Sequence, residues 1–339
     1  MNIENILKNY DPEKLSIATF ASHSAINILR GAKIRGFKTI AISNFNTAWF
    51  YERLWFIDEI WITKPEDFDK LSPKLIKENA ILIPHGSFIE YIGSENILRT
   101  QAPIFGNRYL LEWEADQEKK MLLLEKSGIP TPKIYRRIEE VNGPVIVKLS
   151  GAKGGRGYFI ARNRDELLRK FKDSKDLGNK YIIQEYLIGV PAYYHYFSSK
   201  IKKRVEIFGM DIRYESNVDG RVFDLAEPTF VVVGNLPLVM RESLLPRIQE
   251  YGERLVKTVE ELIPPGLPGP FCLESIVGDD LSIKVFEFSA RIVAGTNVYM
   301  GIGSPYSIMY FEKPLDMGER IAIEILEASR LGKLHEILS

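Results

Sequence analysis

A glycine-rich segment between two predicted strands limits the choice of fold more than any other part of this chain. Residues 144–160 read PVIVKLSGAKGGRGYFI. The β-branched run at 145–147 predicts a buried strand that carries Lys148, and the apolar run at 158–160 predicts a second strand. The loop between them holds four glycines and two cations, Gly151, Gly154, Gly155, Gly157, Lys153 and Arg156. Glycines let successive N–H groups face one anion, so the segment predicts a triphosphate-binding loop.

The loop differs from the two common phosphate-binding motifs. The pattern G-x-x-x-x-G-K-[ST] is absent, and the residues after the loop favour a strand. Walker loops and Rossmann fingerprints both lead into a helix, whose N-terminus holds the phosphate. A tight glycine hairpin with solvated charges stays open as the alternative, so the rest of the chain must decide.

The composition excludes several classes of protein. A chain of 339 residues with 45% hydrophobic residues can form two or three domains with sizeable cores. Its 45 basic residues are balanced by 45 acidic ones, so no overall basic field favours nucleic acid or a membrane surface. The single cysteine, Cys272, excludes an internal disulfide and a cysteine-rich metal site. Since no leader or spanning segment is evident, we expect a cytoplasmic protein.

The first hundred residues predict an open parallel sheet. Apolar runs at 15–20, 38–43, 58–63 and 80–84 alternate with helical or irregular segments. Polar turns follow the first and fourth of these strands, and they contain His23 and Ser87. Ligands of such sheets bind at the carboxyl ends of the strands, so both turns are candidates for binding an anionic or heteroaromatic ligand. The alternative is a pair of helix-capping turns with structural histidines.

The remaining chain predicts a small α+β unit and a larger antiparallel one. A long helix at 109–126 leads to a glycine- and proline-rich linker at 128–132. The small α+β unit has the size of a lid. Beyond it we expect an amphipathic helix at 243–262 and strands at 192–197, 204–214, 221–225, 269–277 and 281–288. We also expect a turn at 218–220 and an apolar run at 228–233. The fold class is α/β and α+β, with an N-terminal parallel domain at 1–104, a connecting helix and linker at 105–132, a lid subdomain at 133–190 and a C-terminal domain at 191–339.

Two acids occupy apolar strands near the C-terminal end. Glu274 lies in PFCLESIV and Glu287 in IKVFEFSARIVAG, thirteen residues later. A short turn between antiparallel strands would bring them face to face, where like charges repel unless a cation lies between them. The pair therefore predicts a Mg²⁺ site. The alternative is that each acid pairs with a nearby lysine or arginine.

These motifs resemble a known superfamily. Lys148 on its strand, the GAKGGRG loop, QEYL at 184–187 and two strand acids followed by SAR resemble the ATP-grasp ligases over about residues 105–310. More narrowly, the chain resembles the archaeal formate-dependent formaminoimidazole-carboxamide ribonucleotide (FAICAR) synthetases through SHSA at 22–25, PHGSF at 84–88, FGNR at 105–108, GNLP at 234–237, RESLLP at 241–246, EFSARIVAGTN at 287–297 and GSPYS at 303–307. The resemblance implies an ATP-grasp fold whose N-terminal domain is Rossmann-like.

The resemblance also implies a role for each matching residue. ATP phosphates would meet Lys148 and the loop residues Gly151, Lys153, Gly154, Gly155 and Gly157. The adenine hinge would comprise Gln184, Glu185 and Leu187. Mg²⁺, with Mn²⁺ as an alternative, would bind Glu274 and Glu287. The ribonucleotide would contact His23, Ser87 and Asn235. The catalytic group would comprise Lys148, Arg291 and Asn297.

The reaction implied is the formylation of aminoimidazole-carboxamide ribonucleotide (AICAR) in purine biosynthesis. ATP would phosphorylate formate to formyl phosphate, and the ribonucleotide amine would then attack the formyl carbon to give FAICAR. We expect these small molecules as partners, no nucleic acid and no membrane, and a homo-oligomer. Two rival interpretations remain, another ATP-grasp carboxylate–amine ligase and a non-catalytic nucleotide-binding paralogue.

Two features depart from the superfamily pattern or leave it undecided. Many ATP-grasp enzymes place an acid for the ribose hydroxyls after the hinge glycine, whereas Gly189 here precedes Val190 and Pro191. The ribose ligand therefore stays open. The lysine that precedes the lid could be either Lys119 or Lys120.

Overall fold

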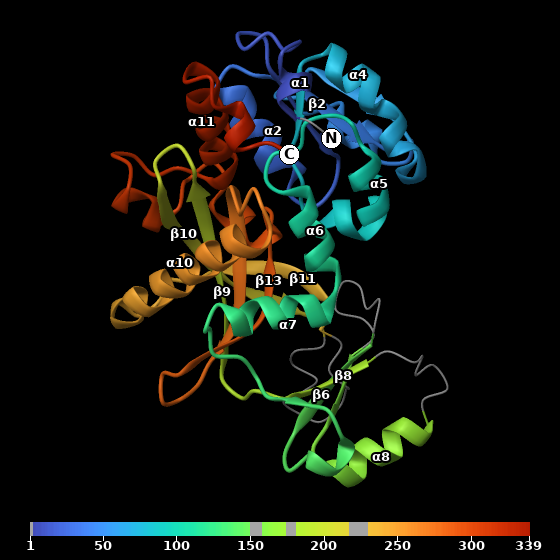
Figure 1. The fold of residues 1–339 in the computed structure, drawn as a ribbon, viewed down its shortest axis with the longest axis vertical. Helices are drawn as coiled ribbons and strands as arrows, with labels where there is room; N and C mark the ends of the chain where they lie inside the picture. The colour runs from blue at the N-terminus through green and yellow to red at the C-terminus, as the bar shows by residue number, and fades with distance from the viewer. Residues whose placement is uncertain (1–2, 150–157, 174–180, 217–229) are drawn as a thin grey trace.

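Three sheets organise the protein in the computed structural model, which describes residues 3–149, 158–173, 181–216 and 230–339 (Figure 1). The first is a four-stranded sheet in the order β3-β2-β1-β4, the second a five-stranded sheet in the order β11-β10-β9-β12-β13, and the third a four-stranded sheet in the order β5-β8-β6-β7. The combination matches the predicted class of α/β and α+β. None of the helices in the described ranges combines the length and apolar character that a membrane span needs.

The first sheet is parallel throughout its described pairs, as predicted. Its strands are β1 (Ser16–Phe20), β2 (Lys38–Ser43), β3 (Glu59–Ile62) and β4 (Ala80–Leu82). All five residues of β1 are buried, because a parallel sheet is covered on both faces and its central strand needs a continuous apolar run. The helical segments around it are α1 (Ile3–Leu7), α2 (Ala25–Ile34), α3 (Ala48–Tyr51), η1 (Pro65–Leu71), α4 (Ser72–Lys77), η2 (Phe88–Ile92) and α5 (Ser94–Arg99).

The predicted single helix at 109–126 is wrong. The structure has two helices, α6 (Arg108–Ala115) and α7 (Gln117–Lys126), separated at Asp116. Asp116 has extended backbone angles, and its carboxylate accepts hydrogen bonds from the backbone N–H groups of Glu118 and Lys119. An aspartate that caps a helix competes with continuation of the preceding one, so the chain turns there.

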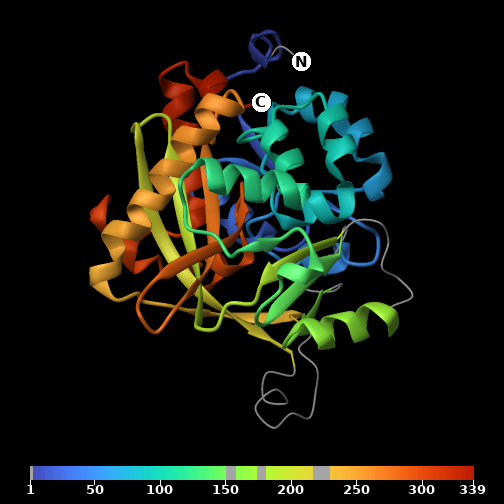
Figure 2. The ribbon, with the colours of Figure 1, turned by 60° about the horizontal axis from the view of Figure 1, so that its bottom comes forward.

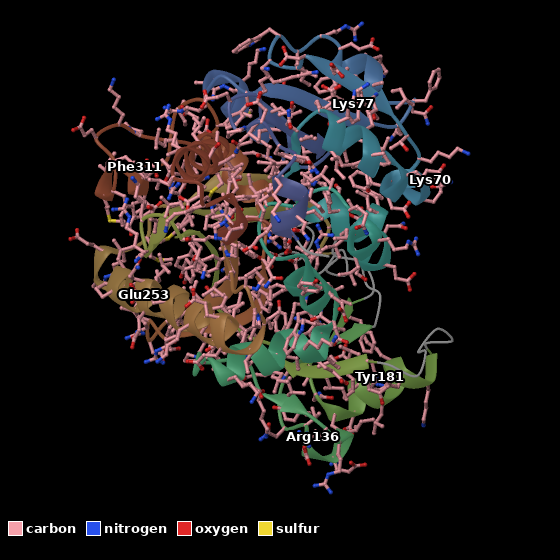
Figure 3. All side chains as sticks on the ribbon, turned by 45° about the horizontal axis from the view of Figure 1, so that its top comes forward. Lys70, Lys77, Arg136, Tyr181, Glu253 and Phe311 are labelled. Carbon is pink, nitrogen blue, oxygen red and sulfur yellow. The ribbon has the colours of Figure 1, made fainter. Side chains whose placement is uncertain are left out.

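The predicted strand–loop–strand unit is present. β6 (Val145–Leu149) pairs antiparallel with β7 (Tyr158–Ala161), and Lys148 lies opposite Tyr158. The glycine loop itself lies outside the described residues. The unit is completed by β5 (Ile134–Tyr135), η3 (Ile138–Glu140), α8 (Arg164–Asp173) and β8 (Tyr181–Glu185). It occupies the end of the molecule away from the parallel sheet, as the positions of Arg136 and Lys77 show (Figure 3).

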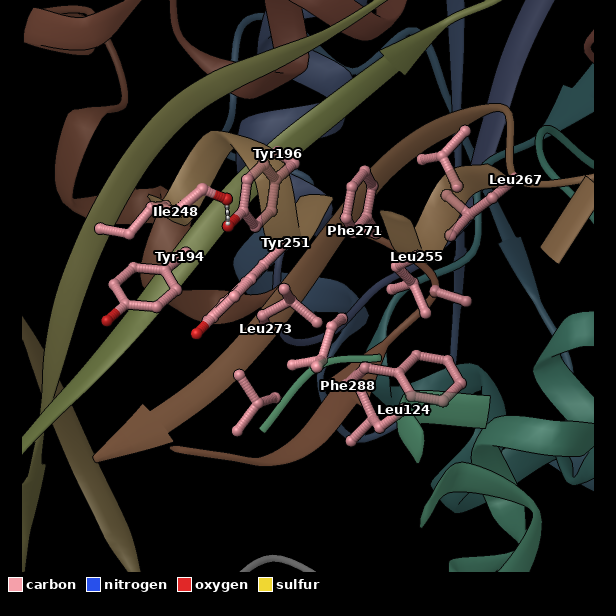
Figure 4. Close-up of a cluster of buried hydrophobic side chains, with 14 of the residues drawn as sticks. Leu124, Tyr194, Tyr196, Ile248, Tyr251, Leu255, Leu267, Phe271, Leu273 and Phe288 are labelled. Carbon is pink, nitrogen blue, oxygen red and sulfur yellow. Dashed lines mark hydrogen bonds between the residues drawn. The ribbon is translucent and has the colours of Figure 1, made fainter. Parts of the chain in front are cut away.

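The five-stranded sheet forms the centre of the molecule. Its strands are β9 (Val190–Ser199), β10 (Arg204–Glu215), β11 (Val232–Pro237), β12 (Gly269–Val277) and β13 (Ile283–Ser289). The helix α10 (Leu245–Leu262) packs along one face of it (Figure 2). In that core the Tyr196 ring stacks on Phe271 at 4.7 Å, and its hydroxyl donates to the Ile248 carbonyl (Figure 4). Because side chains alternate along a strand, this packing leaves the neighbouring positions to the opposite face.

Several boundaries in this region differ from the prediction. The segment GNLP lies within β11 rather than after a strand. The helix begins with a 3₁₀ turn, η4 (Glu242–Leu244), because Pro246 favours the first turn of an α-helix and limits how early it starts. The predicted strand at 221–225, the turn at 218–220 and the start of the run at 228–233 lie outside the described residues.

The C-terminal segment returns to the parallel sheet. It comprises η5 (Ala294–Tyr299), η6 (Pro305–Met309), α11 (Met317–Arg330) and η7 (Leu334–Glu336). Helix α11 packs against α2, and their apolar residues share one core with β1 and β4. This core includes residues of three of the four predicted domain ranges, 1–104, 105–132 and 191–339, so those ranges stay predictions.

Candidate active site

The two strand acids lie opposite each other on the sheet face away from α10. Glu274 of β12 is the register partner of Glu287 of β13, as predicted, and Tyr193 of β9 is the other neighbour of Glu274. A β-bulge follows, because Ser275 pairs with Val285 and Phe286 is skipped. Bulges re-aim side chains. Phe286 accordingly packs edge-on against the Tyr193 ring at 6.4 Å.

Glu274 is held by an arginine that the sequence did not single out. Arg213 of β10 donates two parallel hydrogen bonds to the Glu274 carboxylate, at 2.9 and 2.6 Å. The guanidinium also lies 4.0 Å from the centre of the Tyr193 ring. A bidentate pair backed by an aromatic face fixes the carboxylate in one orientation.

Glu287 is held by a lysine. Lys120 Nζ lies 2.5 Å from the Glu287 carboxylate, and the lysine side chain is almost fully buried. Lys119, by contrast, turns outward and pairs with Glu112 at 2.9 Å. The geometry therefore brings Lys120, and not Lys119, to the acid pair. Burial alone would raise the pKa of Glu287, but the positive charges of Lys120 and Lys148 lower it to about 2.

Lys148 joins the same cluster from the lid sheet. The side chain is buried, and its Nζ lies 5.3 Å from the centre of the Phe286 ring. Burial lowers the pKa of Lys148, and the neighbouring carboxylate of Glu287 partly restores it. Two acids and three cations thus meet between the lid and the central sheet, an excess of positive charge suited to a polyphosphate.

The acid pair shows both arrangements that the sequence left open, a facing pair and pairing of each acid with a lysine or arginine. The acids face each other, and each also pairs with a cation. Within the described ranges no group of three or more His, Cys, Asp or Glu residues could hold a metal. A pair of carboxylates nonetheless fits Mg²⁺, which commonly takes one or two protein carboxylates and completes its shell with phosphate oxygens and water.

The two polar turns of the parallel sheet meet at one edge, as expected. The rings of His23 and His85 stack 5.4 Å apart and nearly parallel. His85 Nε2 donates to the Phe20 carbonyl, and its Nδ1 accepts from the Ser87 backbone N–H. Ser87 Oγ donates to Ser22 Oγ at 2.9 Å. His85, which belongs to the PHGSF turn at 84–88, thereby links both turns.

The segment after Glu287 connects this edge to the central sheet. Asn297 Nδ2 donates to the His23 carbonyl at 3.3 Å, which places Asn297 beside the polar turns. Arg291 forms an ion pair with Glu114 of α6 at 2.9 Å, and the same carboxylate accepts from the Ala290 backbone N–H. Glu114 gives no distinguishing signal in the sequence, since it lies among other acids of a polar helix face.

The candidate hinge residues differ in what they contact. Gln184 is buried, with its amide against the sulfur of Met121. Glu185 binds Lys284 through its carboxylate and pairs with Lys133 through its backbone N–H. Leu187 is half-buried, two residues beyond the end of β8. The side chain and the backbone N–H of Glu185 are both engaged, so a hinge role would have to use its backbone carbonyl. The loop candidates Gly151, Lys153, Gly154, Gly155 and Gly157 lie outside the described residues.

Comparison with known proteins identifies the family. A family model described as "Protein of unknown function (DUF1246)" matches residues 17–135, and one described as "Domain of unknown function (DUF1297)" matches residues 161–339. The chain is 60% identical over 339 residues to a 5-formaminoimidazole-4-carboxamide-1-(beta)-D-ribofuranosyl 5'-monophosphate synthetase from Caldivirga maquilingensis, and the match covers all of both chains. A synthetase of the same name from Ignicoccus hospitalis is 49% identical over 350 residues, again with full coverage of both. The chain belongs to this synthetase family.

Solved structures agree with that assignment. The IMP biosynthesis protein PurP from Thermococcus kodakaraensis is 32% identical with a TM-score of 0.78, covering 95% of this chain and 100% of its own. An N5-carboxyaminoimidazole synthetase from Staphylococcus aureus complexed with ADP has a TM-score of 0.68 at 13% identity, covering 92% of this chain and 77% of its own. The fold expected from the resemblance, ATP-grasp, is thus confirmed for this synthetase-family member.

Proposed function

We propose that this chain is the formate–AICAR ligase of its family, an ATP-dependent enzyme that formylates the ribonucleotide to FAICAR on the way to IMP. The observation that carries the proposal is the cluster of Glu274, Glu287, Lys120 and Lys148 between the lid and the central sheet. Such a mixture of buried acids and cations suits phosphoryl transfer, which needs little besides positioning and charge stabilisation. Membership of the synthetase family supports the identity of the ribonucleotide.

The cations would hold the triphosphate. Lys148 and Lys120 are buried, so their attraction for phosphate oxygens is screened less than at the surface. Glu274 and Glu287 would bind Mg²⁺, which supplies neutralisation of the charge that develops on the transferred phosphoryl group. If Glu274 turned to the metal, the guanidinium of Arg213 would be free to bind an anionic oxygen of formate or phosphate.

The ribonucleotide would bind at the neighbouring sheet edge. His23 and Ser87 would supply an imidazole and a hydroxyl there, and Asn235 of β11 would supply an amide from the central sheet. Asn297 anchors the backbone of His23. The amine attacks the formyl carbon and phosphate leaves, so the chain need mainly align the two reactants and exclude water.

Two other interpretations are tested by the same assay. One is an ATP-grasp ligase for another carboxylate and amine, and the other is a non-catalytic nucleotide-binding paralogue. ADP release would be measured by a coupled assay with ATP, formate and AICAR, each omitted in turn. We expect release that depends on all three. Release with AICAR absent but an amino acid present, or no release at all, contradicts the proposal. The cytoplasmic location and the homo-oligomeric state stay predictions.

The division into two binding regions predicts a selective effect at His23. Removal of one ligand-contacting hydrogen-bond donor or acceptor in His23→Ala should weaken AICAR binding by roughly 1–3 kcal/mol and leave ATP binding unchanged. Calorimetric titration with each ligand separately measures this. His335→Ala, at an exposed histidine near the C-terminus, is the matched control and should change neither affinity. A loss confined to ATP would contradict the division.

A further inference from the structure

A buried polar chain runs through the central sheet to the proposed ribonucleotide region. His195 of β9 and Asp211 of β10 are at most 1% exposed, and His195 Nε2 lies 2.7 Å from Asp211 Oδ1. The second carboxylate oxygen of Asp211 accepts from Asn235 Nδ2, also at 2.7 Å. The chain thus ends on Asn235, which lies half-buried on the edge strand β11.

The backbone of η5 closes over this chain from the side of the polar turns. A Cβ atom at Gly295 would lie 2.1 Å from Asp211 Oδ1 and 2.7 Å from His195 Nε2, so only glycine fits there. Two residues later, Asn297 donates to the His23 carbonyl. The turn η5 therefore contacts both Asp211, the partner of Asn235, and the backbone of His23, so both residues border the space in which the proposed function places the ribonucleotide.

The carboxylate determines which end of the Asn235 amide faces that space. An ionised carboxylate has only acceptors, whereas an amide has a donor end and an acceptor end. The amide nitrogen must therefore face Asp211, and the carbonyl oxygen points the other way. Within the described residues, Asn235 Oδ1 has no hydrogen-bond partner.

From this geometry, which rests on the proposed function, we infer that Asp211 is a positioning residue that orients Asn235 to present an acceptor to the ribonucleotide. An acceptor at this position selects a ligand that offers an N–H group, as the amine and carboxamide of the aminoimidazole-carboxamide do. A carbonyl or carboxylate of a different ligand would face like partial charge and be rejected.

His195 makes the inference testable, because it fixes the orientation of any amide placed at position 211. Its Nδ1 is buried and has no partner among the described residues, so a proton there would be an unsatisfied donor. The proton therefore stays on Nε2. After Asp211→Asn, the new carbonyl must accept from that Nε2–H, and the new NH₂ group faces Asn235. The Asn235 amide then has to reverse and present its donor end to the ligand.

Exchange of the two side chains should restore the arrangement. In the double variant Asp211→Asn/Asn235→Asp, the amide at 211 again accepts from His195 and donates to the carboxylate at 235. The other oxygen of that carboxylate faces the ligand as an acceptor. The single variant Asn235→Asp instead places two carboxylates against each other, where like charges repel.

The experiment is calorimetric titration of AICAR, and separately of ATP, into the wild type, both single variants and the double variant. We expect each single variant to bind AICAR about tenfold or more weakly, the double variant to recover most of that loss, and ATP affinity to stay within twofold in all four. A purely structural role would make the two losses add and would disturb ATP binding too. Losses that add, or an unchanged affinity in Asp211→Asn, would overturn the inference.

The variant Asn235→Ala and the turnover of the wild type separate failure of this inference from failure of the proposed function. Asn235→Ala changes a half-buried edge residue and tests the contact whatever the stability of the Asp211 variants, and an unchanged AICAR affinity there overturns the inference. If the wild type turns over AICAR but the double variant does not recover, the inference alone fails. If the wild type binds ATP and not AICAR, the proposed function fails with it.

Discussion

At the scale of single residues, the cations around the acid pair explain how two facing carboxylates can be buried together. Two facing carboxylates repel, and a buried charge is costly unless it is paired. Arg213 and Lys120 neutralise one acid each, at distances of 2.6 and 2.5 Å. Each buried carboxylate is thus paired with a cation, which offsets the repulsion between the two acids.

The metal assignment predicts a large effect at Glu287. Glu287→Gln should lower turnover at least ~100-fold, because a neutral amide has the shape of the carboxylate but is a much weaker ligand for Mg²⁺. Steady-state rates over a range of Mg²⁺ concentrations measure the loss. The matched control is Glu260→Gln, which removes an exposed carboxylate that pairs with Lys200. Near-normal turnover of the Glu287 variant at low Mg²⁺ would rule out the assignment.

The buried His85 predicts how stability depends on pH. Burial lowers the pKa of His85 from 6.5 to about 3, although its hydrogen bond to the Phe20 carbonyl opposes the shift. Between those values the unfolded state binds a proton that the folded state does not. Stability from this group is therefore complete above about pH 6.5 and falls as the pH is lowered toward 3, by up to about 1.4 kcal/mol per pH unit.

The variant His85→Gln isolates that effect, since it retains a donor for the Phe20 carbonyl and does not titrate. Between pH 7.5 and pH 5 the wild type should lose more stability than the variant. The difference between their free energies of unfolding in urea should therefore shrink as the pH is lowered. His335→Gln, at an exposed site, should keep the wild-type dependence. Equal pH dependence of the wild type and the His85 variant would contradict a buried neutral imidazole.

At the scale of secondary-structure elements, the break between α6 and α7 places the lysine of the site. Asp116 caps α7 one turn before Lys120, and the change of direction carries Lys120 to Glu287 on β13. A continuous helix would have kept Lys120 in phase with the residues of α6. The cap therefore acts on function through the position of one element.

The cap predicts a measurable loss. Asp116→Ala should lower the free energy of unfolding by about 1 kcal/mol, because two backbone N–H groups lose their acceptor. Asp116→Asn should retain most of the stability, and Glu125→Ala, at an exposed position of the same helix, should change little. Chemical denaturation of the four proteins gives the comparison. A loss shared by Asp116→Asn would mean that charge, rather than capping, matters there.

At the scale of the whole molecule, the crossing of α2 and α11 joins the two ends of the chain. A Cβ atom at Gly31 would lie 2.2 Å from the backbone carbon of Gly318, and one at Gly318 would lie 1.9 Å from the Asn27 carbonyl oxygen. The helix backbones touch, and Asn27 Oδ1 accepts from the Gly318 N–H. The parallel sheet and the C-terminal segment are thereby fixed relative to each other, which keeps His23 beside Asn297.

The contact predicts a strong effect of a single methyl group. Gly31→Ala should destabilise the protein by about 1–3 kcal/mol, because the atoms it meets belong to backbone that cannot rotate away. The control is Gly143→Ala, where a Cβ atom meets nothing within 4 Å, and we expect a change within about 0.5 kcal/mol. Urea denaturation measures both. If Gly31→Ala were neutral, the close approach of the two helices would be wrong.

Much of this arrangement follows from the sequence because it depends on local patterns. The apolar strands at 269–277 and 283–289, together with a short turn, predict that Glu274 and Glu287 come near each other, and the β-bulge that skips Phe286 then puts them directly opposite. Continuous apolar runs separated by helices similarly predict the parallel sheet and the edge at which His23 and Ser87 lie. Specific motifs also indicated the family, which the comparisons confirm.

The partners of the site residues were decided only by the tertiary structure. Arg213 and Asp211 reach the site from β10, Lys120 from α7 and Glu114 from α6. No spacing in the chain relates these residues to the acids or to Asn235. The choice of Lys120 over Lys119 depends on the direction in which α7 leaves its cap. Periodicity fixes which face of an element is buried, whereas pairing between distant elements depends on how those faces pack, and one chain's local pattern does not contain that information.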